Sequence, residues 1–170
     1  VALDKTGTIT KGTPKVTDIV PAAGWEENDL LQLALTLEAK SEHPLARAIL
    51  DRGEQDGLVP GEVGDFRALP GNGLSATYAG KVLLGGSLAF ISGQTELPPE
   101  LAERAEALSK EGKTPLLFTS DKNVVGIIAV ADTIKEDSPA AIRALKNMGI
   151  RVVMLTGDNE RTAEAIRRQV

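Results

Sequence analysis

The 170-residue sequence has no cysteine, a single histidine and only 3% aromatic residues. Without cysteine the chain has neither a disulfide framework nor a thiolate metal site, which suits a reducing cytosolic setting. No stretch reaches the roughly 18 consecutive apolar residues of a membrane span, so we expect the chain itself not to cross a bilayer. The net charge of -5 gives no basic surface, which argues against nucleic acid and anionic membranes as partners.

What is present is enough hydrophobic sequence, 42%, for one ordinary domain or two small ones. Apolar residues at helical spacing predict a helix over 29–39. Prolines at permissive first-turn positions predict helices that start at Pro44, at Pro99 and, behind an N-cap at Ser138, at Pro139. Strand patterns around short polar turns predict hairpins over 74–84 and 116–130.

Two further strands resemble each other in type. Residues 1–3 and the mostly apolar run 150–155 each lead into a polar loop that contains threonine, glycine and aspartate. Such runs are typical of a parallel sheet covered on both faces, whose ligands bind at the carboxyl ends of the strands. We therefore predict an α/β fold in which the middle of the chain is an inserted domain. We expect both ends of the sequence to be cuts through a larger fold.

The two polar loops suggest phosphoryl chemistry. Asp4, at a strand end, is a candidate nucleophile toward a phosphoryl group if a cation offsets the charge. Backbone N–H groups and hydroxyls of residues 6–8 are candidate donors to phosphoryl oxygens, and Thr156 with Gly157 forms an anion site at a helix start. The alternative is that Asp4 and Asp158 are ordinary turn or cap residues.

Taken together, these loops resemble a known pair of motifs. The run Asp4-Lys5-Thr6-Gly7-Thr8-Ile9-Thr10 resembles the phosphorylation signature of P-type ATPases, and Thr156-Gly157-Asp158-Asn159 resembles their second phosphate loop. The resemblance implies catalytic roles for Asp4, Lys5, Thr6, Thr156, Gly157 and Asp158. It also implies a truncated phosphorylation domain of haloacid-dehalogenase type over 1–13 and 131–170, and an inserted α+β nucleotide-binding domain over 14–130, with an antiparallel sheet flanked by helices.

The middle of the chain resembles the heavy-metal branch of that family. Ser41-Glu42-His43-Pro44 resembles its histidine-proline motif, and Gly71-Asn72-Gly73 its glycine loop. The resemblance implies that Glu42 and His43 meet the adenine of ATP and that Gly71, Gly73 and Gly85 let the backbone approach the nucleotide. A departure is Gly86, where the family often has asparagine. Asp132 resembles the aspartate that reconnects the two domains and is a further nucleotide-binding candidate, with a solvated helix start as the alternative.

The resemblance further implies ATP as substrate, ADP as product and Mg²⁺ held partly by Asp4 and the Thr6 carbonyl. The remaining membrane and actuator domains of the same polypeptide would be its partners, which makes the chain a cytoplasmic domain of an integral membrane protein. Copper(I) is the favoured cargo, with zinc, cadmium or lead as alternatives. By itself the chain should be catalytically incomplete, because the family's final acidic motif does not occur in it.

Two other functions remain open at this point. Related phosphatases carry a second aspartate two residues after the nucleophile, as the general acid and base that hydrolyses the phosphoaspartate. Thr6 occupies that position here, which argues against a phosphatase and favours a pump that holds its phosphoenzyme longer. The third possibility is a nucleotide-binding module without turnover.

Overall fold

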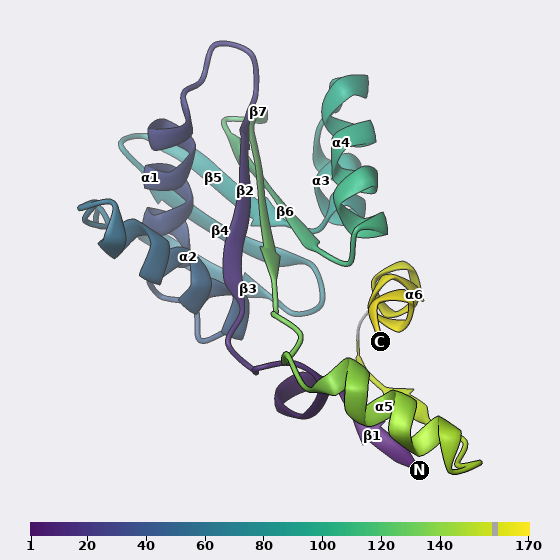
Figure 1. Cartoon of the computed structure of the whole chain (residues 1–170). Coiled ribbons are helices and arrows are strands. Elements are labelled where there is room, and N and C mark those ends of the chain that lie inside the picture. Colours follow the sequence, from purple (N-terminus) through teal and green to yellow (C-terminus); the bar gives the residue numbers. More distant parts are fainter. Residues whose placement is uncertain (158–159) are drawn as a thin grey trace.

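The computed structural model describes residues 1–157 and 160–170, and within them the chain forms two separate β-sheets (Figure 1). The larger sheet is antiparallel with strand order β2-β7-β6-β5-β4-β3, and the smaller pairs β1 with β8 in parallel. The strands are β1 Ala2–Asp4, β2 Lys15–Pro21, β3 Gly64–Leu69, β4 Gly73–Tyr78, β5 Lys81–Gly86, β6 Thr114–Ser120, β7 Asn123–Ala131 and β8 Val153–Leu155. The helices are α1 Glu27–Glu38, α2 Pro44–Gln55, α3 Leu88–Gln94, α4 Pro99–Lys110, α5 Ser138–Asn147 and α6 Glu160–Gln169.

Helices cover both faces of the larger sheet. Alternation along the central strands sends Phe118 and Ile128 into the core on the α1/α2 side and sends Leu117 and Ile127 to the α3/α4 side. All four side chains are fully buried. Burial of one such side chain stabilises the fold by about 1.5–3 kcal/mol, so the central strands β6 and β7 anchor both layers. The predicted helices and both predicted hairpins are confirmed.

The helix over 138–147 begins differently from the prediction. Asp137 occupies the N-cap position without a side-chain capping bond, and Ser138 is the first helical residue. The Ser138 hydroxyl is buried and donates to the Ile9 carbonyl, 2.8 Å away. The Ser138 hydroxyl therefore bonds to a carbonyl of a loop distant in sequence and, contrary to the prediction, does not cap its own helix.

The smaller sheet differs from the predicted buried strand. β8 is only three residues long, and Val153 and Leu155 are 44% and 55% exposed. Met154 points the other way, into a small core formed by Ile9, Ile142 and Ile166. The prediction of a strand covered on both faces was therefore wrong for this chain, because α5 and α6 cover one face only.

Two crossing segments join the sheets: residues 10–14 lead into β2, and residues 132–137 lead out of β7 into α5 (Figure 1). They are bridged to each other at Thr10 and Ile134. This arrangement agrees with an insertion between the two parallel strands, while the boundaries 1–13, 14–130 and 131–170 remain predictions. Among the described helices, none has the length and apolarity needed to cross a bilayer.

Candidate functional site

The carboxyl ends of the two parallel strands bring the polar loops together. Asp4 is the last residue of β1 and pairs in register with Leu155, the last residue of β8. Lys5 and Thr156 therefore leave the sheet side by side at the same edge. Gly157 follows Thr156, whereas Asp158 lies outside the described residues.

The loop after Asp4 is a single irregular turn, Lys5–Ile9, with a defined shape. The Thr10 backbone N–H donates to the Lys5 carbonyl at 3.0 Å, and the Thr10 hydroxyl lies 3.0 Å from the same oxygen. Ile9 is buried and fixes the loop to the small core, while Asp4 and Thr6 remain exposed. The N–H of Gly7 already donates to the Thr10 hydroxyl at 3.3 Å. The arrangement leaves the Asp4 carboxylate accessible at a strand end, beside a loop held by its own hydrogen bonds.

A separate concave site lies on the larger sheet. It is a cavity of about 670 Å³ between the α1–α2 connection, the β3–β4 turn and the end of β5. Five of the six residues predicted to bind nucleotide line it: Glu42, His43, Gly71, Gly73 and Gly85. Much of the remaining wall is apolar and comes from Leu45, Ala46, Phe66, Leu69, Leu74 and Leu116. Such a cavity, apolar with a few convergent polar groups, is typical of a small-molecule site.

Asp132, the sixth predicted residue, does not line this cavity. Its carboxylate accepts a short hydrogen bond from the Thr10 hydroxyl. It also accepts hydrogen bonds from the backbone N–H groups of Gly12 and Thr13, each at 3.2 Å. The carboxylate therefore serves the connection between the two sheets.

His43 is held by the start of α2. Its ring Nδ1 accepts the Leu45 N–H at 3.1 Å, which caps the helix, and Pro44 supplies the first turn. A neutral imidazole with Nδ1 as acceptor carries its proton on Nε2. The ring therefore presents an N–H donor at the rim of the cavity.

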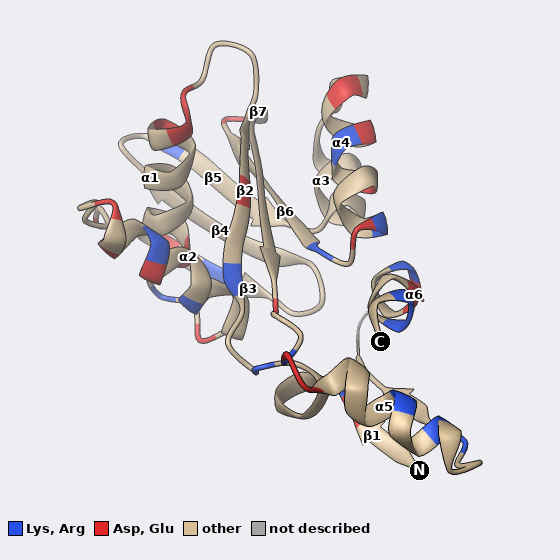
Figure 2. Cartoon of the chain, in the orientation of Figure 1, with Lys and Arg blue, Asp and Glu red and all other residues tan. Residues whose placement is uncertain are grey.

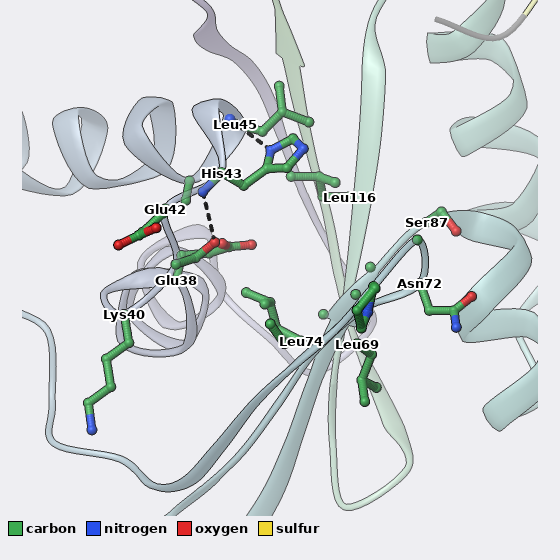
Figure 3. Close-up of a pocket in the computed structure, with 18 of the residues that line it drawn as sticks. Glu38, Lys40, Glu42, His43, Leu45, Leu69, Asn72, Leu74, Ser87 and Leu116 are labelled. Carbon is green, nitrogen blue, oxygen red and sulfur yellow. Dashed lines mark hydrogen bonds between the residues drawn. The ribbon is translucent and has the colours of Figure 1, made fainter. Parts of the chain in front are cut away.

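Glu38, which the sequence reasoning missed, supplies the buried acidic group of the cavity. It is 7% exposed, and burial raises the pKa of its carboxyl to about 7, although a hydrogen bond from Ser41 opposes the shift. Figure 3 shows its carboxyl facing the space between His43 and Leu74, whereas Lys40 and Glu42 extend away from that space. A signal was available: Glu38 follows Leu31 by seven residues and therefore lies on the buried stripe of α1.

The glycines of the cavity allow two backbone segments to touch. A Cβ at Gly73 would lie 2.1 Å from the Gly85 carbonyl oxygen, and one at Gly86 would lie 2.5 Å from the Asn72 carbonyl oxygen. The β3–β4 turn therefore packs directly against the end of β5. The same contact explains why glycine stands at position 86, since a larger residue would force the turn outward.

Comparison with known proteins gives consistent matches. Residues 1–170 match the model of the haloacid dehalogenase-like hydrolases. Copper-transporting ATPase 1 of Rhizobium meliloti (strain 1021) is 46% identical over 171 residues, which cover 100% of this chain and 21% of that protein. A crystal structure of a zinc-transporting PIB-type ATPase in an E2.Pi state matches with a TM-score of 0.78 and 38% identity, over 99% of this chain and 27% of that one.

A third match covers only part of the chain. The crystal structure of the N-domain of a copper-transporting P-type ATPase is 26% identical, with a TM-score of 0.56. It covers 69% of this chain and 98% of its own. The predicted fold class is confirmed by these matches. The chain spans about a fifth of the length of the curated relatives that it matches.

Proposed function

Because the chain belongs to the haloacid dehalogenase-like hydrolase family and is homologous along its length to heavy-metal P-type ATPases, we propose that it is the nucleotide-binding and phosphate-accepting part of an ATP-driven metal pump. The observation that carries this proposal is one chain with two sites. An apolar cavity of nucleotide size lies on the larger sheet, and an exposed aspartate ends a strand of the smaller one.

In this proposal the cavity holds the adenine end of ATP. Its apolar walls suit a flat aromatic base, and Glu38 and His43 supply polar contacts at its edge. Near pH 7 the Glu38 carboxyl exists in both protonation states, so it is able to donate or accept a hydrogen bond. Gly71 and Gly73 allow the nucleotide to approach the backbone of the turn. We assign the acidic contact to Glu38 in preference to Glu42, because Glu38 is buried at the cavity and Glu42 is exposed.

Asp4 is the proposed phosphoryl acceptor. A carboxylate oxygen attacks the γ-phosphorus of ATP, the bond from that phosphorus to the β–γ bridging oxygen breaks, and ADP leaves with the electron pair. Thr6, Lys5, Thr156 and the N–H groups of the two loops are the proposed stabilisers of the transferred group. Because Thr6 replaces the aspartate that a phosphatase uses as its base, we expect the acyl phosphate to persist.

Mg²⁺ fits the oxygen donors at this edge. The Asp4 carboxylate and the Thr6 backbone carbonyl are hard ligands, and Mg²⁺ is commonly held by one or two carboxylates together with water and substrate phosphates. When bound, the ion offsets the negative charge of the phosphoryl group. Among the described residues no group of three or more acidic, histidine or cysteine side chains is placed to hold a metal ion. The proposal therefore gives this chain only part of the Mg²⁺ site.

The cargo and partners are proposed from the relatives. The relatives are named as copper-transporting, copper-exporting or zinc-transporting ATPases. Copper(I) is therefore the first candidate for the transported ion, followed by zinc and then by cadmium or lead. Membrane and actuator domains of the same polypeptide are the proposed partners, with this chain on the cytoplasmic side. The alternatives are a phosphatase and a module without turnover. Labelling of Asp4 from γ-labelled ATP separates the pump from the module without turnover, and a phosphatase screen separates the pump from a phosphatase.

An NMR titration of the 170-residue chain with ATP tests the nucleotide site. We expect the largest amide shifts at Gly71, Gly73, Gly85 and around His43. The matched control is Glu103→Gln, a change of an exposed residue on α4, which should leave the titration unchanged. Shifts confined to the loop after Asp4 would contradict the proposed cavity.

A further inference from the structure

The loop that follows Asp4 is held by the segment that leaves the larger sheet. The Lys135 ammonium donates to the Gly7 carbonyl at 2.8 Å, and the Lys135 backbone N–H donates to the Ile9 carbonyl at 3.0 Å. The Ser138 hydroxyl donates to the same Ile9 carbonyl at 2.8 Å. Residues 135–138 therefore hold the loop at two carbonyls. Figure 2 shows charged residues gathered where the crossing segments meet, beside the start of α5.

The segment that leaves the larger sheet also forms hydrogen bonds with the residues that follow the Asp4 loop, 10–13. Asp132 accepts from the Thr10 hydroxyl and from the backbone N–H groups of Gly12 and Thr13, and the Lys11 N–H donates to the Thr133 carbonyl at 2.8 Å. A carboxylate with several donors is a strong anchor, because each bond is charge-assisted. Asp132 thus fixes the crossing segment 132–137, which carries Lys135.

The contact between Lys135 and Gly7 holds the Gly7–Thr8 peptide at its carbonyl. Gly7 has φ +77°, a conformation that glycine adopts without strain, and a Cβ at this position would meet no atom within 4 Å, so no side-chain packing at Gly7 adds to this contact. In a trans peptide the carbonyl and the following N–H point in opposite directions. Because the Lys135 ammonium donates to the Gly7 carbonyl, it therefore also sets the direction of the Thr8 N–H. Lys135 as a whole residue is half-buried, and its hydrogen bond to the Gly7 carbonyl is exposed.

We propose that Lys135 is a positioning residue for phosphoryl transfer. It holds the Gly7–Thr8 peptide so that the Thr8 N–H is a fixed donor to the phosphoryl oxygens at Asp4. This inference rests on the proposed acceptor role of Asp4. Because Lys135 lies on the segment leaving β7, a displacement of that segment would change the position of the Gly7 carbonyl in the acceptor loop.

The test uses the intact pump with Lys135→Met, and Lys146→Met on the exposed side of α5 as the matched control. Acid-stable phosphoenzyme is formed in parallel from ATP and from inorganic phosphate, and nucleotide affinity is measured separately. Misplacement of a catalytic group by about 1 Å can lower the rate about a hundredfold. We expect Lys135→Met to slow phosphorylation roughly tenfold to a hundredfold, both from ATP and from inorganic phosphate, while nucleotide affinity stays unchanged. Lys135→Arg should restore much of the rate, and Lys146→Met should match the wild type.

The outcomes separate this inference from the proposed function. Wild-type rates in Lys135→Met, or a loss with ATP alone, would overturn the positioning role while leaving Asp4 as acceptor. Wild-type protein that forms no acyl phosphate at Asp4 would overturn both. Thermal unfolding of each variant is compared with the wild type. If Lys135→Met does not fold, Lys135→Leu, which also removes the donor, takes its place, and an unchanged rate in that folded variant together with an unshifted Thr8 amide resonance would overturn the inference.

Discussion

Replacement of Glu38 by glutamine should change how the stability of the chain depends on pH. The side chain is 7% exposed at the end of α1, and burial raises its pKa from 4.5 to about 7. Glutamine has nearly the same shape but does not ionise. The variant therefore removes the proton equilibrium while it keeps most of the packing around the cavity.

The sign and size of the effect follow from linkage. A carboxyl whose pKa is raised by folding binds its proton more tightly in the folded state, so its stabilising contribution is complete below pH 4.5. That contribution is lost as the pH rises toward 7. The gap between 4.5 and about 7 corresponds to roughly 3 kcal/mol in total, of which roughly 2.5 kcal/mol falls between pH 5 and pH 8.

Urea unfolding at pH 5, 6, 7 and 8 measures this loss directly. The free energy of unfolding of the wild type should fall by the stated amount relative to Glu38→Gln across the range. Glu103→Gln, which changes an exposed carboxylate on α4, should follow the wild type. Parallel pH profiles for the wild type and Glu38→Gln would refute the assignment of a strongly raised pKa to Glu38.

Three further changes test other parts of the structure. His43→Ala should weaken ATP binding about tenfold by calorimetry and, because a helix cap is lost, lower the free energy of unfolding by about 1 kcal/mol. Gly73→Ala should destabilise the chain by about 2 kcal/mol or more in urea, since its Cβ would meet the Gly85 carbonyl, whereas Gly93→Ala, on an exposed helical position, should be neutral or slightly stabilising. In the intact pump, Thr6→Asp should shorten the lifetime of the acyl phosphate about tenfold or more, measured by chase of the labelled enzyme; an unchanged lifetime would contradict the role given to Thr6.

Much of the fold was predictable because local signals agreed with tertiary packing. Prolines at helix starts predicted α2 and α4, and alternating apolar residues around short polar turns predicted the hairpins β4–β5 and β6–β7. Three elements were not predicted: β2, β3 and α3. The sequence of β3 lacks a clear apolar–polar alternation, and the strand is an irregular edge strand, with a register shift against β4 and a positive φ of 47° at Asp65. α3 has only seven residues, too few for helical periodicity to be recognised.

Residues of the candidate site could be named from the sequence where they lie in contiguous motifs, and could not be named where only folding brings residues together. The loop after Asp4 and the cavity residues His43, Gly71, Gly73 and Gly85 came from short motifs. The burial of Glu38 depends on the packing of α1 against the sheet, and no local spacing relates it to the glycine loop. In the same way, the bond from Lys135 to the Gly7 carbonyl joins residues 128 positions apart.

The most direct measurement of the proposed function is acid-stable labelling of the intact pump from γ-labelled ATP, followed by mapping of the labelled peptide. It is run on the wild type and on Asp4→Asn, with ATP affinity measured for both. We predict label on the peptide that contains Asp4 in the wild type, no label in Asp4→Asn, and nearly equal ATP affinity, because the amide keeps the shape of the carboxylate and loses the nucleophile. Label that persists in Asp4→Asn, or that maps to a different peptide, would contradict Asp4 as the phosphoryl acceptor.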